Sequence, residues 1–166
     1  MTLPLAALGA LVAALIETSI APELTVAGAQ VDLVLTLAVL AAILIGVEDG
    51  LVWAFLGGVM LDMLIPARPI GATALTMVLV VGLAILAARL PAPRRSLAIA
   101  AVFGATWAFH LLLLLVMAAT EGVMLGSLQP VVVLSAAIQN TVLAIIAAIA
   151  FDALGRRFAP AERPDW

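Results

Sequence analysis

Six apolar stretches, separated by short polar breaks, make up most of this chain. Hydrophobic residues account for 66% of the sequence and charged residues for only 10%. A soluble domain of 166 residues needs more polar side chains than this to cover its outer face. A transmembrane barrel would show alternating segments of roughly ten residues, and none is seen. The composition therefore predicts an all-α integral membrane protein.

The six apolar stretches are each expected to form one helix of a transmembrane bundle. A helix needs roughly 20 apolar residues to cross a bilayer core about 30 Å thick. The predicted spans are residues 3–20, 32–47, 50–65, 71–89, 96–120 and 130–154, in one domain of residues 1–155. Residues 156–166 are expected to form a short cytoplasmic tail. The second and third spans are predicted to form a tight helical hairpin with Gly46 and Gly50 at its turn.

The distribution of arginine predicts the orientation of the chain in the membrane. Lysine is absent, and six of the seven arginines lie in residues 89–95 and 156–163. Short loops rich in arginine stay in the cytoplasm. An even number of spans then places both termini in the cytoplasm and leaves only Arg68 for the outer face. The bacterial cytoplasmic membrane is the expected location.

Three acidic residues are predicted to gather near the outer face. Glu17 and Asp62 lie beyond the midpoints of two outward-running spans, and Asp32 opens the second span. Charged groups inside a membrane are costly, so they often mark a functional site. With Arg68 nearby, these acids suggest a polar cavity or a docking site for a cation or a partner's arginine. In the alternative interpretation each acid reaches the headgroup layer or caps a helix, and Asp32 is well placed as an N-cap.

A second polar group is predicted between the last two spans. His110 and Asn140 fall at similar depths on antiparallel helices, so we expect His110 to hydrogen-bond Gln139 or Asn140. Such bonds contribute about 0.6 kcal/mol in membranes, which favours a packing role over a proton relay. A single histidine argues against a metal site. Near the end of the last span, Asp152 is expected to pair with Arg156 one turn later.

Small residues at four-residue spacing predict close helix contacts, within the bundle or with a partner. The stripe in the first span consists of Ala6, Ala10 and Ala14. Ala54 and Gly58 form a similar pair in the third span.

No catalytic pattern is present in the sequence. HExxH, the Walker loop and G-x-G-x-x-G are all missing. We therefore expect neither an enzyme nor a bound cofactor. No basic cluster lies outside the membrane-flanking loops, so nucleic acid is not an expected partner.

Short motifs between residues 17 and 71 resemble the rod shape-determining protein MreD family. They read E-T-S-I-A-P at 17–22, V-D-L-V-L at 31–35, G-G-V-M-L-D at 57–62 and R-P-I-G at 68–71. The positions that match the family pattern are Asp32, Gly58, Asp62, Pro69 and Gly71. Glu17 replaces the usual glutamine, and Val31 replaces the usual proline.

This resemblance implies a non-enzymatic inner-membrane subunit of the bacterial cell-elongation (rod shape) machinery. Members of the family bind MreC, a bitopic periplasmic protein, and work with the MreB filament system. They help to control lateral peptidoglycan synthesis. Their fold is similar to that of the substrate-binding subunits of energy-coupling-factor transporters, whose alanine-rich first helix docks a partner. The stripe formed by Ala6, Ala10 and Ala14 would suit that role.

The main alternative is that the chain is itself a vitamin-binding subunit of such a transporter. That function needs a deep outward pocket with aromatic and polar walls. Aromatic residues make up only 5% of the chain, and tyrosine is absent, which disfavours recognition by stacking.

Overall fold

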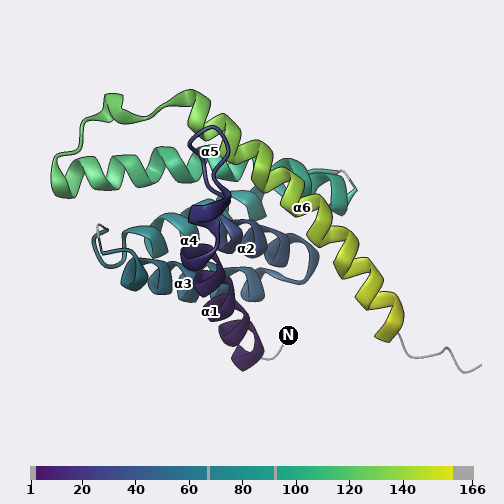
Figure 1. Cartoon of the computed structure of the whole chain (residues 1–166). Coiled ribbons are helices and arrows are strands. Elements are labelled where there is room, and N and C mark those ends of the chain that lie inside the picture. The colour runs from purple at the N-terminus through teal and green to yellow at the C-terminus, as the bar shows by residue number, and fades with distance from the viewer. Residues whose placement is uncertain (1–2, 67, 92, 159–166) are drawn as a thin grey trace, which may run out of the picture.

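The computed structural model describes the backbone of residues 3–66, 68–91 and 93–158, and their side chains except those of residues 3, 24 and 152–158. This part of the chain is all-helical (Figure 1). Its elements are α1 (Leu3–Ser19), η1 (Ala21–Leu24), α2 (Leu33–Leu44), α3 (Val47–Leu64), α4 (Ala72–Ala87), α5 (Arg94–Glu121), η2 (Leu125–Ser127) and α6 (Pro130–Phe158).

Each α-helix falls on one of the predicted apolar stretches, but the helices differ in their ability to cross a membrane. Three segments are long and apolar enough to do so, namely Pro4–Glu23, Arg94–Glu121 and Pro130–Phe151. The apolar helices α2 and α4 have only 12 and 16 residues. At 1.5 Å per residue α2 is about 18 Å long, well short of a bilayer core.

The hairpin between α2 and α3 turns at residues 45–46, earlier in the chain than the predicted residues 48–49. Only Ile45 and Gly46 separate the two helices, and Gly50 lies in the first turns of α3 rather than in the loop. A Cβ atom on Gly50 would lie 2.3 Å from the Cβ of Ala42. Gly50 is therefore needed for close helix packing, and the prediction of a turn glycine at this position was wrong.

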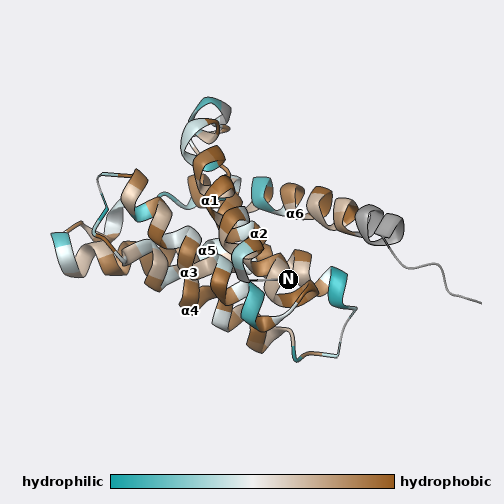
Figure 2. Cartoon of the chain, turned by 90° about the horizontal axis from the view of Figure 1, so that it is seen from below, coloured by the Kyte–Doolittle hydropathy of each residue, from teal (hydrophilic) through white to brown (hydrophobic). Residues whose placement is uncertain are grey.

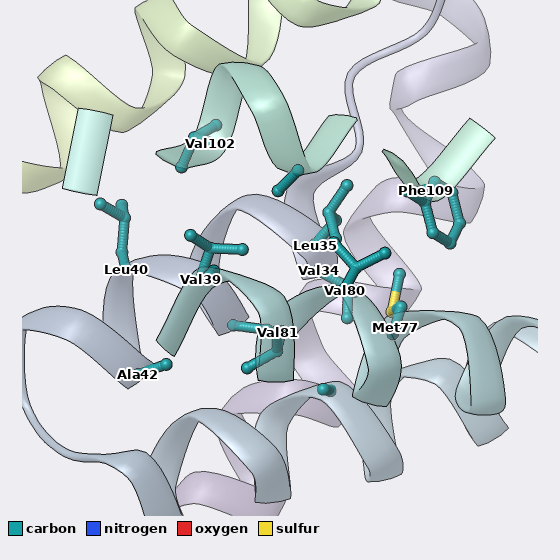
Figure 3. Close-up of a cluster of buried hydrophobic side chains, with 14 of the residues drawn as sticks. Val34, Leu35, Val39, Leu40, Ala42, Met77, Val80, Val81, Val102 and Phe109 are labelled. Carbon is teal, nitrogen blue, oxygen red and sulfur yellow. The ribbon is translucent and has the colours of Figure 1, made fainter. Parts of the chain in front are cut away.

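Helix α2 is the centre of the molecule. It contacts all five of the other α-helices, and its side chains from Val34 to Ile43 are buried except for Leu37. Figure 3 shows Val39 and Leu40 of α2 between residues of α4, such as Val81, and Val102 of α5. Burial on every side explains why this short segment is apolar all round.

Two further glycines of α3 allow close packing on both sides of that helix. A Cβ on Gly57 would meet the side chain of Val34 in α2 at 2.3 Å. A Cβ on Gly58 would lie 2.5 Å from the backbone Cα of Ala74 in α4. The two glycines thus set the spacing of α3 against α2 and α4.

The alanine stripe of α1 faces the interior of the chain. Ala6, Ala10 and Ala14 are buried, and α1 packs chiefly on α3 and α2. Close packing extends to Gly9, where an added Cβ would lie 2.6 Å from the indole ring of Trp53. The stripe is covered by the chain's own helices and is not a free docking surface, which corrects the role suggested for it by the resemblance.

Large apolar side chains cover the outside of the helices. Exposed residues of this kind occur on α1, α3, α4, α5 and α6. Figure 2 shows that hydrophobic residues, in brown, make up most of the helices. Contiguous apolar surface on this scale marks contact with lipid or with another protein. The end of α6 extends beyond the other helices in Figure 1. Before that end, Ile145, Ile146 and Ile149 are exposed, whereas Ala144 and Ala148 of the same helix are buried.

Candidate functional site

The predicted acidic residues meet at one end of the molecule, which we call the Asp62 end. Here α1 and α3 end, and α2 and α4 begin. The opposite end, at which α4 ends and α5 begins, is called the Arg89 end. The antiparallel order of α1 to α4 brings Glu17, Asp32 and Asp62 to the same end, as the sequence predicted.

Asp62 caps the N-terminus of α4 from the neighbouring helix α3. Its carboxylate accepts backbone N–H bonds from Gly71 at 2.9 Å, Thr73 at 3.0 Å and Ala74 at 3.2 Å. The first N–H groups of a helix have no intrahelical acceptor and carry partial positive charge. A buried carboxylate at this position therefore satisfies its own hydrogen-bonding needs and those of the helix.

The chain between α3 and α4 is shaped for this cap. Gly71 has a φ of +94°, a conformation that residues with a Cβ rarely adopt, and it turns its N–H toward Asp62. Arg68 donates to the hydroxyl of Thr73 at 3.2 Å, which ties the loop to the first turn of α4.

Glu17 plays the same part for α2. Its carboxylate accepts the N–H of Val34 at 2.7 Å. Asp32 occupies the N-cap position of α2, but its side chain makes no capping bond. The prediction that Asp32 caps α2 was wrong, because the end of α1 brings the longer Glu17 side chain to that place.

The carboxylate of Asp32 instead joins a polar network with α5 and α6. Asn140 accepts the backbone N–H of Asp32 at 2.8 Å and donates to the Asp32 carboxylate at 2.8 Å. Its amide also donates to the hydroxyl of Thr106 at 3.0 Å. Asn140 and Thr106 are fully buried, so this network fixes α2, α5 and α6 relative to one another.

The predicted bond between His110 and α6 is not formed. Nδ1 of His110 hydrogen-bonds the Thr106 carbonyl of its own helix at 2.9 Å. The Gln139 amide donates to Ser135 and, at 3.5 Å, to the Val26 carbonyl. A polar link between α5 and α6 does exist through Asn140, but it reaches Thr106, one turn before His110. The sequence pattern identified the face of α5 that meets α6 but misjudged the depth of the contact by one turn, because residues four apart share a helix face.

A hollow of about 320 Å³ opens beside these caps. Its lining includes Glu17, Asp32, Arg68, Thr18 and Gln30, together with proline and aliphatic side chains. Two of the three predicted acids and Arg68 therefore share one hollow, whereas Asp62 does not line it. Each acid lining it is also engaged in a structural hydrogen bond.

The bonds formed by the acids of this end are hydrogen bonds in which a carboxylate is the acceptor. Asp62 and Glu17 each accept N–H bonds from a different helix. No group of three or more potential metal ligands occurs among the described residues. Thr73 and Thr106 take part in the networks and were not predicted, because a threonine in an apolar helix gives no distinctive sequence signal. The predicted pair of Asp152 and Arg156 lies outside the described side chains.

Comparison with known proteins identifies no relative of this chain. The chain matches no protein-family model, no curated protein and no solved structure.

Proposed function

We propose that this protein is a non-enzymatic membrane scaffold that resembles the MreD family and binds MreC in the bacterial cell-elongation machinery. In this role it helps other proteins of that machinery to control lateral peptidoglycan synthesis. The main observation in support is that residues matching the family motifs lie together where α3 packs against the start of α4. The Asp62 carboxylate accepts a hydrogen bond from the backbone N–H of Gly71. Gly58, which lies one turn before Asp62 in α3, packs against α4.

A second motif position supports the same interpretation. Asp32 links α2 to Asn140 of α6 and lies beside Glu17 in the polar hollow. Glu17 stands where the family usually has glutamine, and a glutamine side-chain oxygen is also able to accept the N–H of Val34. The motif residues thus hold the ends of the helices in place. This role is expected of a scaffold that presents a rigid outer surface.

We propose further that all six α-helices cross the bacterial cytoplasmic membrane, with both termini in the cytoplasm. The fold would then be similar to that of energy-coupling-factor transporter subunits. The packing supports this arrangement, because α2 and α4 lie beside α5, which is itself long enough to cross. The Asp62 end would face the periplasm, where the bulk of MreC resides.

The outer surface of the Asp62 end offers a direct test of partner binding. Ile70 lies in the α3–α4 loop and is 82% exposed, so nothing within the chain requires its side chain. We expect Ile70→Asp to reduce co-purification of MreC in detergent by about ten-fold, because a central apolar anchor contributes at least about 1.4 kcal/mol to binding. Asp62 and Gly58 are unsuitable for this test because both are buried within the fold.

The matched control is Leu90→Asp, which makes the same kind of change in the α4–α5 loop, where Leu90 is 61% exposed. This variant should retain MreC at the wild-type level. Wild-type protein that fails to retain MreC at all would refute the proposed function. Equal losses in both variants would place the contact elsewhere.

A vitamin-binding subunit remains the competing proposal. The hollow at the Asp62 end is polar and opens outward, but none of the side chains that line it is aromatic. Isothermal titration with thiamine, biotin and riboflavin separates the two proposals, because such a subunit binds its vitamin tightly in isolation.

A further inference from the structure

A second hollow, of about 320 Å³, lies at the Arg89 end of the molecule. Its walls come from the end of α2, the start of α3 and the end of α4, and include Ile45, Val47 and Ala88. The guanidinium-bearing side chains of Arg89 and Arg94 complete the lining. The hollow thus combines apolar walls with two cationic side chains.

Both arginines are available to a ligand. Their side chains are exposed, and neither makes a side-chain hydrogen bond or ion pair with another described residue. The acidic side chains of Glu48 and Asp49, in the first turn of α3, do not line this hollow. A planar guanidinium forms two parallel hydrogen bonds with phosphate oxygens, so a pair of them matches a phosphate group.

The start of α3 also borders the hollow, through Gly46 and Val47. Glu48 and Asp49 in its first turn offset the partial positive charge of this helix end, and the Asp49 carboxylate lies near Gly46. The two arginines are therefore the determinants of anion binding.

We propose that this hollow binds the phosphate group of an anionic phospholipid. The apolar walls distinguish a lipid from a soluble phosphate, because they suit the glycerol and upper acyl region of the same molecule. Leu86 and Leu90, next to Arg89, are exposed apolar side chains that would face the surrounding lipid. Basic pockets between transmembrane helices are known to take lipid headgroups in this way. The proposal requires insertion in a bilayer and is independent of MreC binding.

The test uses the full-length protein purified in detergent and native mass spectrometry with added phosphatidylglycerol or phosphatidylcholine. Wild-type protein should retain phosphatidylglycerol in clear preference to phosphatidylcholine. The double variant Arg89→Gln/Arg94→Gln should weaken phosphatidylglycerol binding roughly thirty-fold, as expected for the loss of two arginine–phosphate contacts. Phosphatidylcholine binding should not change.

The matched control is Arg95→Gln, because Arg95 adjoins Arg94 but does not line the hollow. This variant removes one charge from the same end and should weaken phosphatidylglycerol binding by no more than about five-fold, well short of the loss in the double variant. Equal weakening in the control would show general charge attraction and overturn the proposal. Displacement of the lipid by inorganic phosphate at equal concentration would show a soluble-phosphate site and would also overturn it.

Discussion

At the scale of single residues, the buried Asp62 and the half-buried Glu17 serve as caps for helices that follow them in the chain. The Asp62 carboxylate accepts hydrogen bonds from three backbone N–H groups of the α3–α4 loop and α4. The Glu17 carboxylate accepts one from α2. A conventional N-cap comes from the residue that precedes the helix. Here the acceptor comes from a neighbouring helix, so each cap also holds two elements together. Low polarity around Asp62 strengthens these bonds and makes their loss costly.

Asp62→Ala should therefore lower the free energy of unfolding in detergent by about 3 kcal/mol, since it leaves buried N–H groups without an acceptor. Asp62→Asn keeps one acceptor oxygen and should lose about half as much. Denaturant titration followed by circular dichroism measures both changes. Glu121→Ala, at an exposed position near the end of α5, is the control and should leave stability unchanged. A loss for Asp62→Ala no larger than the control's would contradict the capping role.

At the scale of elements, the glycines of α3 decide how closely the helices pack. Gly58→Ala would place a methyl group 2.5 Å from the backbone of Ala74. We expect it to reduce the free energy of unfolding by about 2 kcal/mol, because backbone of α4 has to move. Gly104→Ala is the matched control in α5, where an added Cβ meets nothing within 4 Å. The control should be neutral or stabilising by up to about 1 kcal/mol, and a similar loss at both positions would argue against the packing role.

The elements themselves were largely predictable from the sequence, whereas their side-chain partners were not. Apolar runs and their polar breaks located all six predicted helices, because hydrophobic length is a strong local signal. The gathering of Glu17, Asp32 and Asp62 followed from the antiparallel order alone. Whether Asn140 reaches His110 or Thr106 depends on how far α6 is shifted along α5, because residues four apart share one helix face. Which of the three acids caps α2 depends on the rotation of each helix about its axis. A helix that is apolar on every face gives no pattern from which to read that rotation.

At the scale of the whole molecule, two arrangements in the membrane are consistent with helix length. Either all six α-helices cross, or only α1, α5 and α6 do, since these contain the three long apolar segments. We propose the first arrangement because of the packing. Figure 3 shows α2 beside α4 and α5, and Leu35, Val80 and Phe109 belong to one buried core. Helices that share a core in this way are expected to lie at the same depth, so a membrane around α5 would also surround α2 and α4.

Labelling of single cysteines distinguishes the two arrangements, because the chain has no cysteine of its own. The substitutions Ile70→Cys, Leu90→Cys and Met124→Cys place a thiol in three successive loops at side chains that are 82%, 61% and 82% exposed. If six helices cross, a membrane-impermeant maleimide added to intact cells should label the variants at 70 and 124. The variant at 90 should react only after lysis. If only three helices cross, positions 70 and 90 lie on one side of the membrane and position 124 on the other. Parallel behaviour of the variants at 70 and 90 would thus refute the six-helix bundle and remove the periplasmic placement of the Asp62 end.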